Sequence, residues 1–209
     1  MTPSAAFGLR AYALWGLAAF LCVGVAGYAY SVLPVGGSFG PQVLANLFAR
    51  PWLLLHAAGA GAALAIVAFQ FLPALRRRRA VHRWLGRVYA AAALVSGSAG
   101  LVLSFGTTAG PVAGVGFGLL GVFWIYTTVQ GWLTARARRF DEHRRWMIRS
   151  FSLVLAAVTL RLYMPLSEVL GLDVGRAYVA IAWLCWVPNF LVAELWLRRE
   201  MARRLQPAR

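Results

Sequence analysis

The chain has 209 residues, of which 61% are hydrophobic and only 13% charged, and its mean hydropathy is +0.67. Ordinary soluble domains carry about 25% charged residues, so the composition excludes a soluble globular protein and a disordered one. The formal net charge is +15, and every one of the 21 basic residues is an arginine. A charge of this size can indicate a nucleic-acid partner, so the positions of the arginines have to be established first.

Six apolar windows are long enough to cross a bilayer, since about 20 mostly apolar residues cover roughly 30 Å of hydrocarbon. In chain order they are Ala11–Leu33, Trp52–Leu75, Trp84–Phe105, Val112–Thr134, Trp146–Leu166 and Ala177–Leu197. The first exceeds the apolar region of a cleavable signal peptide, which favours a retained helix. The prediction is one all-α membrane domain over residues 1–209, in which the second to fifth helices form an up-down four-helix bundle flanked by the first and sixth.

The arginines are distributed unevenly around these windows. Eighteen of the 21 lie on one side, as Arg10 before the first window and as three groups within residues 76–87, 136–149 and 198–209, and only Arg50, Arg161 and Arg176 are left for the other side. The positive-inside rule therefore predicts that both termini lie in the cytoplasm. Runs such as Arg76–Arg79 are explained as topological anchors near anionic headgroups. The lipid bilayer is thus the predicted partner, and nucleic acid is not.

Two of the loops on the arginine-rich side resemble each other. Gln70 precedes His82 by 12 residues and Gln130 precedes His143 by 13, and each histidine is followed by arginine and tryptophan. Two interpretations stay open: a duplication about an axis along the membrane normal, or the common preference for arginine and tryptophan at a membrane boundary. A duplication would place the third and fifth helices diagonally, so that His82 and His143 face each other at one depth. A bis-histidine b-type haem requires this arrangement.

The two helix faces that contain the histidines differ in the size of their side chains. Three- and four-residue steps from His82 lead to Gly86, Ala90, Ala93, Gly97 and Gly100, and the same steps from His143 lead to Met147, Ser150, Val154, Ala157 and Arg161. The first stripe consists of small residues, which admit either a flat ligand or a neighbouring helix.

A second group of polar residues falls near the outer ends of the predicted helices. His56 lies in the second window and Arg161 in the fifth, followed seven residues later by Glu168. Ionisable residues inside a membrane indicate function by default, although a hydrogen bond to a neighbouring helix would explain His56 and snorkelling would explain Arg161. The functional interpretation is an outer polar cavity that holds an anion, such as a carboxylate, a quinone head group or a propionate.

Four further expectations concern local structure. Glu194 is expected to pair with Arg198 four residues on. Pro188 and Asn189 predict a kink, with the Asn189 amide bonding freed backbone groups. Asp141 and Glu142 are expected at the start of the fifth helix, where negative charge is favoured. Residues 42–49 are expected to form a short interfacial helix. The sequence lacks the HExxH, GxSxG and Walker A motifs, which leaves hydrolase and phosphotransferase chemistry without support.

Several motifs also resemble a known family. They are His56, His82-Arg83-x-x-Gly86-Arg87-x-Tyr89, His143-Arg144-Arg145-Trp146-Met147-Ile148-Arg149-Ser150, Ala157-Val158-Thr159-Leu160-Arg161 and Trp183-x-x-Trp186-Val187-Pro188-Asn189. In these motifs the chain resembles a bacterial family of predicted multi-helix membrane proteins classed as a domain of unknown function (DUF2306 type). The resemblance spans the second to sixth predicted helices and implies a family without an activity.

A fainter similarity links the chain to the six-helix, two-haem cytochromes b. It is based on the Leu55-His56 context and on a histidine, His82, near the start of the third helix. In those proteins the ligands pair the second helix with the fourth and the third with the fifth, but the fourth window here contains no histidine. The resemblance therefore implies at most one haem, held by His82 and His143. The alternatives are a cofactor-free binding or transport protein with an outer cavity at His56 and Arg161, and a structural or regulatory membrane protein.

Overall fold

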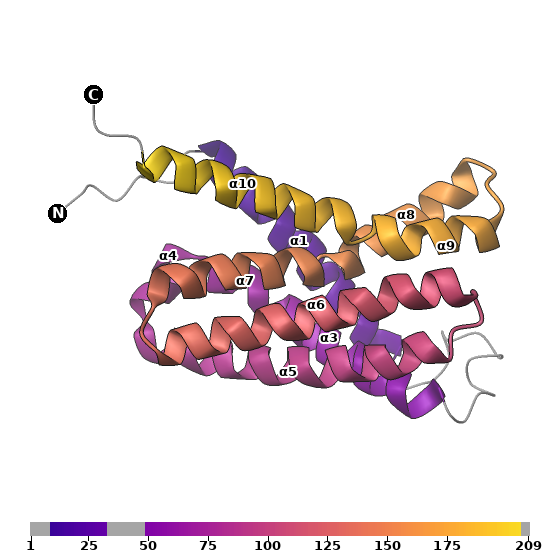
Figure 1. Cartoon of the computed structure of the whole chain (residues 1–209), viewed down its shortest axis with the longest axis horizontal. Helices are drawn as coiled ribbons and strands as arrows, with labels where there is room; N and C mark the ends of the chain where they lie inside the picture. The colour runs from indigo at the N-terminus through magenta and orange to yellow at the C-terminus, as the bar shows by residue number, and fades with distance from the viewer. Residues whose placement is uncertain (1–8, 33–48, 206–209) are drawn as a thin grey trace.

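The computed structural model describes residues 9–32 and 49–205, and within these ranges the chain is helical without strands. The helices are α1 (Leu9–Val32), α3 (Ala49–Gln70), α4 (Pro73–Arg77), α5 (Arg79–Phe105), α6 (Pro111–Arg136), α7 (Phe140–Val154), α8 (Ala156–Val169), α9 (Val174–Leu184) and α10 (Val187–Leu205) (Figure 1). Six spans are long and apolar enough to cross a membrane, α7–α8 and α9–α10 forming one each. The predicted all-α membrane fold is confirmed. The expected interfacial helix at residues 42–49 falls, except for its last residue, outside the described residues.

The helices pack largely in chain order. Helices α3, α5, α6 and α7 form the up-down bundle, α1 lies against α3 and α8, and α9–α10 lie against α6, α7 and α8 (Figure 1). Small residues let α3 and α5 approach closely, because a Cβ on Gly59 would lie 2.8 Å from the Ala92 carbonyl oxygen and from the Ser96 Cβ. Such close contacts are typical of helix packing in membranes. There is no hydrophobic driving force between helices in lipid, so association depends on the close van der Waals contact that small residues allow.

Helix boundaries at the arginine-rich loops differ from the predicted windows. Helix α5 starts at Arg79 and α7 at Phe140, so the charged residues before each window form the first helical turns. Helix α3 ends at Gln70, five residues before the predicted end. The reason is Pro73, which lacks an N–H and disfavours helical geometry in the residue before it. Pro73 then occupies the first turn of the short helix α4.

The fifth and sixth spans are each broken near the middle. Helix α7 ends at Val154 and α8 begins at Ala156, while α9 ends at Leu184 and α10 begins at Val187. Beside Pro188, the Asn189 amide donates to the Cys185 carbonyl oxygen (2.9 Å) and to the Thr159 hydroxyl (2.9 Å). The predicted kink and the predicted role of the Asn189 amide are both confirmed. The second bond also ties α10 to α8.

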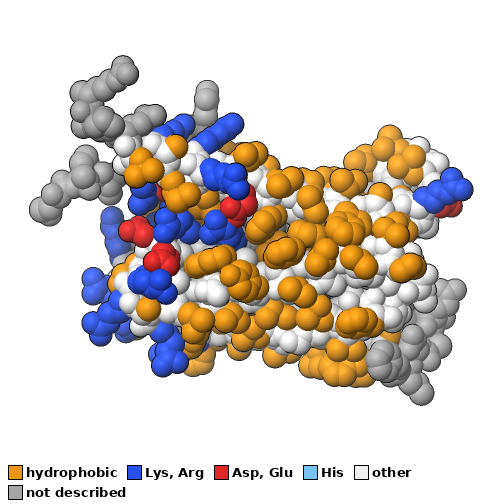
Figure 2. Space-filling view, in the orientation of Figure 1, with side chains coloured by type: hydrophobic (Ala, Val, Ile, Leu, Met, Phe, Trp, Pro, Cys, Tyr) orange, Lys and Arg blue, Asp and Glu red, His pale blue; other side chains and the backbone are white. Residues whose placement is uncertain are grey.

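Charge divides the molecule into two ends. Figure 2 shows the basic side chains gathered where α4, the α6–α7 turn and the last turns of α10 lie, whereas hydrophobic side chains cover the long flanks. We call this end the basic end. The flanks consist of exposed large hydrophobic residues, among them Phe105 (92% exposed) and Val169 (84%). An apolar flank of this kind fits contact with lipid, since soluble monomers rarely expose large contiguous apolar patches.

Candidate functional site: two histidines and the buried polar groups of the bundle

The structure brings His82 and His143 to the basic end of the bundle. His82 lies in the first turn of α5 and His143 in the first turn of α7, and the two imidazoles are within electrostatic range of each other. The His143 Nδ1 lies 2.8 Å from the Gly131 carbonyl oxygen of α6. A carbonyl only accepts, so the Nδ1 carries a proton, and in the neutral form of the ring the lone pair is on the Nε2. The His82 Nδ1 is buried and has no hydrogen-bond partner among the described residues.

Gln70 lies beside His82 but contacts its backbone. The Gln70 Nε2 donates to the His82 carbonyl oxygen (3.3 Å), while the Oε1 is buried without a partner in the described part of the chain. In the other loop the equivalent contact with the histidine comes from the backbone of Gly131. The two loops therefore share a sequence pattern but use different groups to contact their histidines.

The small-residue stripe of α5 divides into an open part and a closed part. A Cβ on Gly86, one turn from His82, would meet no atom within 4 Å. Further along the helix, a Cβ on Gly97 would lie 2.7 Å from the Ile125 side chain, and one on Gly100 would lie 3.0 Å from the His56 Nδ1. Neighbouring side chains thus fill the far part of the stripe, whereas there is space beside His82.

A hydroxyl cluster lies in the core between α5, α6 and α7. The Tyr89 hydroxyl is 2.6 Å from the Ser150 Oγ, which is 2.8 Å from the Thr128 Oγ1, and the Trp124 indole donates to Tyr89 (3.3 Å). All four side chains are buried. Tyr89 and Ser150 each lie seven residues after one of the two histidines, so they share its helix face about two turns further along. That spacing is the signal in the sequence from which the cluster can be found, and the prediction missed it.

At the opposite end, His56 and Arg161 lie within electrostatic range of each other. The His56 Nδ1 is 3.0 Å from the Ser96 carbonyl oxygen, and the Ser96 hydroxyl donates to the His56 carbonyl oxygen (2.8 Å). The Arg161 guanidinium donates to the Ala157 carbonyl oxygen (3.0 Å) and lies 5.5 Å from the Tyr28 ring centroid.

Glu168 is not part of this group. Its side chain is exposed, and among the described residues it forms no ion pair with Arg161. The nearby Asp173 caps α9 by accepting from the Arg176 backbone N–H (2.9 Å). The structure thus unites two of the three residues predicted for the outer polar cavity.

Ion pairs at the basic end join α10 to α7. The Arg149 guanidinium binds the Glu194 carboxylate, with side chains only 19% and 20% exposed, and Arg144 binds both oxygens of Glu200 (2.8 and 3.0 Å). The predicted pair of Glu194 with Arg198 is therefore wrong. Glu194 faces α7 and bonds a residue 45 positions away, a contact that local helix spacing does not reveal.

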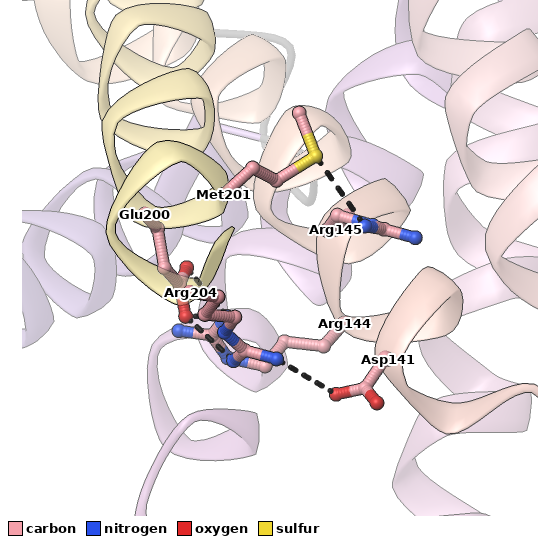
Figure 3. A network of polar contacts seen from close by, with 6 residues as sticks. All are labelled: Asp141, Arg144, Arg145, Glu200, Met201 and Arg204. Atoms are coloured by element: carbon pink, nitrogen blue, oxygen red, sulfur yellow. Dashed lines mark hydrogen bonds and ion pairs between the residues drawn. The ribbon is translucent and has the colours of Figure 1, made fainter. Parts of the chain in front are cut away.

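The outermost part of this interface is a small polar pocket (Figure 3). Arg204 binds Glu200 (2.8 Å) and Asp141 (3.5 Å), and the Arg145 guanidinium donates to the Met201 sulfur (3.5 Å). Asp141 and Glu142 lie in the first turn of α7 as expected, but neither caps the helix, and Glu142 binds Arg139 (2.9 Å). The pocket has room for about one water molecule. Across the described residues, no three His, Cys, Asp or Glu side chains come together as a metal site.

Comparison with known proteins gives a family and no activity. Residues 53–197 match the model of a family described as a predicted membrane protein (DUF2306). No curated protein and no solved structure matches the chain. The matched region includes both histidines of the basic end, the hydroxyl cluster, and His56 with Arg161.

Proposed function

Since the chain belongs to the DUF2306 family of predicted membrane proteins, we propose that it is a bacterial inner-membrane protein that carries electrons by means of one b-type haem at the basic end. His82 and His143 are the proposed axial ligands. The observation that carries the proposal is the hydrogen bonding of these two imidazoles: the His143 Nδ1 donates to a backbone carbonyl, and the His82 Nδ1 is buried without a partner among the described residues.

The residues around the two histidines fit a haem in three respects. The bond from the His143 Nδ1 to the Gly131 carbonyl would hold the ring in one orientation, as hydrogen bonds to metal-bound histidines commonly do. There is space at Gly86, one turn from His82. Arg76 lies within electrostatic range of His82 and supplies positive charge for the two propionates.

Each part of the site would have a separate task. A bound haem supplies reversible one-electron iron chemistry. The Gly131 carbonyl would orient the His143 ring, and the hydroxyl cluster closes the bundle further inside with every hydroxyl hydrogen-bonded. The arginines of the basic end attract anionic groups from the cytoplasm, where the positive-inside rule places this end. A quinone in the membrane is the proposed redox partner.

A visible spectrum of the protein, purified from haem-replete cells, tests the proposal. We expect a reduced-minus-oxidised α band that is lost in both His82→Ala and His143→Ala. His56→Ala is the matched control, since its imidazole lies at the other end, and it should keep the band. A colourless wild-type protein that is stable and monodisperse would contradict the proposal, as would a full band in either variant of the basic end.

A second candidate function rests on the proximity of His56 and Arg161. Arg161 has no carboxylate partner among the described residues, so its guanidinium suits an anionic ligand such as a carboxylate or a quinone head group. In this alternative the protein binds or transports a small molecule without a cofactor. Arg161→Gln should abolish binding of such an anion, whereas Arg176→Gln, at the same end, should not. Equal anion binding by both variants would exclude this candidate.

A further inference from the structure

A row of arginines without carboxylate partners runs along α5 at the basic end. Arg79, Arg83 and Arg87 follow one another at four-residue spacing, so they lie on neighbouring turns of one helix face and span about 12 Å along the axis. Arg76 precedes them on α4. All four side chains are exposed. We call these four residues the α5 arginine row.

The chain's own carboxylates at this end are already engaged. Of the six acidic residues, Asp141, Glu142, Glu194 and Glu200 lie at the basic end, and each binds an arginine of α7, of α10 or of the turn before α7. The other two, Glu168 and Asp173, lie at the opposite end. The described part of the basic end of a second, parallel copy therefore has no unengaged Asp or Glu side chain to offer the α5 arginine row.

The equivalent arginine near the other loop shows which groups bind an arginine at this position. Arg87 and Arg149 each follow a tryptophan by three residues. The Arg149 guanidinium lies 4.7 Å from the Trp146 ring centroid and binds the Glu194 carboxylate. Arg87 has an exposed tryptophan, Trp84 (66% exposed), and no carboxylate among the residues that the structure describes. An anion in the position that Glu194 takes at Arg149 is missing at Arg87.

The surroundings of the row indicate where this anion comes from. After Arg87, further along α5, the same helix face continues with Ala91, Leu94 and Val95, all exposed and apolar. The row thus ends at a surface that contacts acyl chains, and exposed tryptophan beside arginine is typical of the headgroup region. A polyanion in water would contact only the arginines farthest from the apolar residues. A phospholipid can contact the arginines with its phosphate and the apolar residues with its acyl chains.

We propose that the α5 arginine row binds the phosphate of an anionic phospholipid whose acyl chains lie along α5. Guanidinium groups bind phosphate through paired N–H donors, and clusters of arginine at a membrane surface favour anionic lipids. In this arrangement the lipid phosphate takes the place at α5 that the carboxylates of α10 take at α7. The proposal does not depend on a haem.

Native mass spectrometry of the full chain, released from detergent after incubation with phosphatidylglycerol or with phosphatidylcholine, tests the proposal. We expect the wild-type protein to retain phosphatidylglycerol in preference to phosphatidylcholine. The double variant R83Q/R87Q should lose about 30-fold in affinity for phosphatidylglycerol, on the basis of the usual contribution of each basic residue near a membrane surface. R198Q/R199Q removes two exposed arginines of α10 at the same end and should retain the lipid.

Three outcomes would overturn the proposal. The first is equal retention of the two lipids by the wild-type protein, and the second is unchanged retention of phosphatidylglycerol by R83Q/R87Q. The third is displacement of the lipid by millimolar inorganic phosphate, which would assign the row to free anions. R83K/R87K keeps the charge and should restore most of the binding. Since all three double variants change exposed side chains, circular dichroism and gel filtration should show an unchanged fold.

Discussion

The two loops that form the basic end have similar sequences and opposite environments. Both contain histidine, arginine and tryptophan at the start of a bundle helix, yet Trp84 of α5 is 66% exposed, whereas Trp146 of α7 packs edge-on against Tyr126 (ring centroids 5.6 Å apart) beneath the Arg149 guanidinium. Helix α6 provides the ring against Trp146, and α10, which packs on α7, provides the Glu194 carboxylate for Arg149.

Whether α10 packs over a loop determines whether the arginines of that loop are paired with carboxylates. Of the six arginines from Arg76 to Arg87, none forms an ion pair with a described carboxylate, while Arg139, Arg144 and Arg149 near the other loop all do. The same local motif therefore serves as a contact between helices in one loop and as a surface for the membrane in the other. The comparison teaches that charge at a membrane boundary has to be assigned from packing as well as from position.

The largest effect is expected from breaking the pair that docks α10 on α7. Glu194→Gln leaves the largely buried Arg149 guanidinium without its counter-charge, and loss of one partner of a buried pair costs about 3 kcal/mol of unfolding free energy. The measurement is thermal unfolding in detergent micelles. Arg87→Gln is the control, since Arg87 has no carboxylate partner among the described residues, and it should leave the melting temperature nearly unchanged. Equal shifts for the two variants would remove the distinction between the loops.

A smaller effect on stability is expected from replacing one glycine near each of the two loops, Gly131 of α6 and Gly86 of α5. A Cβ on Gly131 would lie 2.6 Å from the Met147 sulfur, so Gly131→Ala forces the flexible end of the Met147 side chain to move and should cost about 1–2 kcal/mol. A Cβ on Gly86 meets open space, and alanine is the better helix former, so Gly86→Ala should be neutral or stabilising by up to about 1 kcal/mol. Unfolding midpoints of the two variants, measured side by side, decide the matter. Destabilisation by Gly86→Ala would show that the space beside His82 is filled.

The hydroxyl cluster supplies the next test, because its hydrogen bonds join α5 to α7 and α7 to α6. Ser150→Ala removes a group that bonds both Tyr89 and Thr128 and leaves their buried hydroxyls without this partner. The expected loss is about 1–2 kcal/mol, as is usual for a buried hydrogen-bonding group that loses its partner. Ser98→Ala, an exposed serine of α5, serves as the control and should change the melting temperature little.

The fold could be predicted from the sequence because hydrophobic length and arginine distribution are properties of the chain itself. Six windows and their order required only the thickness of a bilayer. The boundaries were less accurate, since the first turns of α5 and α7 consist of charged residues that hydropathy excludes. The breaks in the fifth and sixth spans were half predicted: Pro188 marks one, while the break at Leu155 has no proline within it.

The candidate site could be predicted only in part. The placement of His82 and His143 at one end followed from their positions in the predicted helices. The partner of Glu194 could not be predicted, because it depends on which helix α10 covers, and several topologies satisfy the same six windows. Likewise, the bond from His143 to the Gly131 carbonyl comes from the backbone, which carries no residue-specific signal in the sequence.

The smallest expected effect concerns the outermost ion pairs of the α7–α10 interface. Arg204 is 57% exposed and binds Glu200 and the still more exposed Asp141. Exposed pairs contribute about 0–1 kcal/mol and are screened by salt, so Arg204→Gln should shift the melting temperature only slightly, and less at high ionic strength. Glu194→Gln should keep most of its larger shift at the same salt concentration, because both side chains of its pair are about four-fifths buried. Equal salt sensitivity of the two variants would mean that α10 is held to α7 by exposed charges alone, and α7 would then be no better covered than α5.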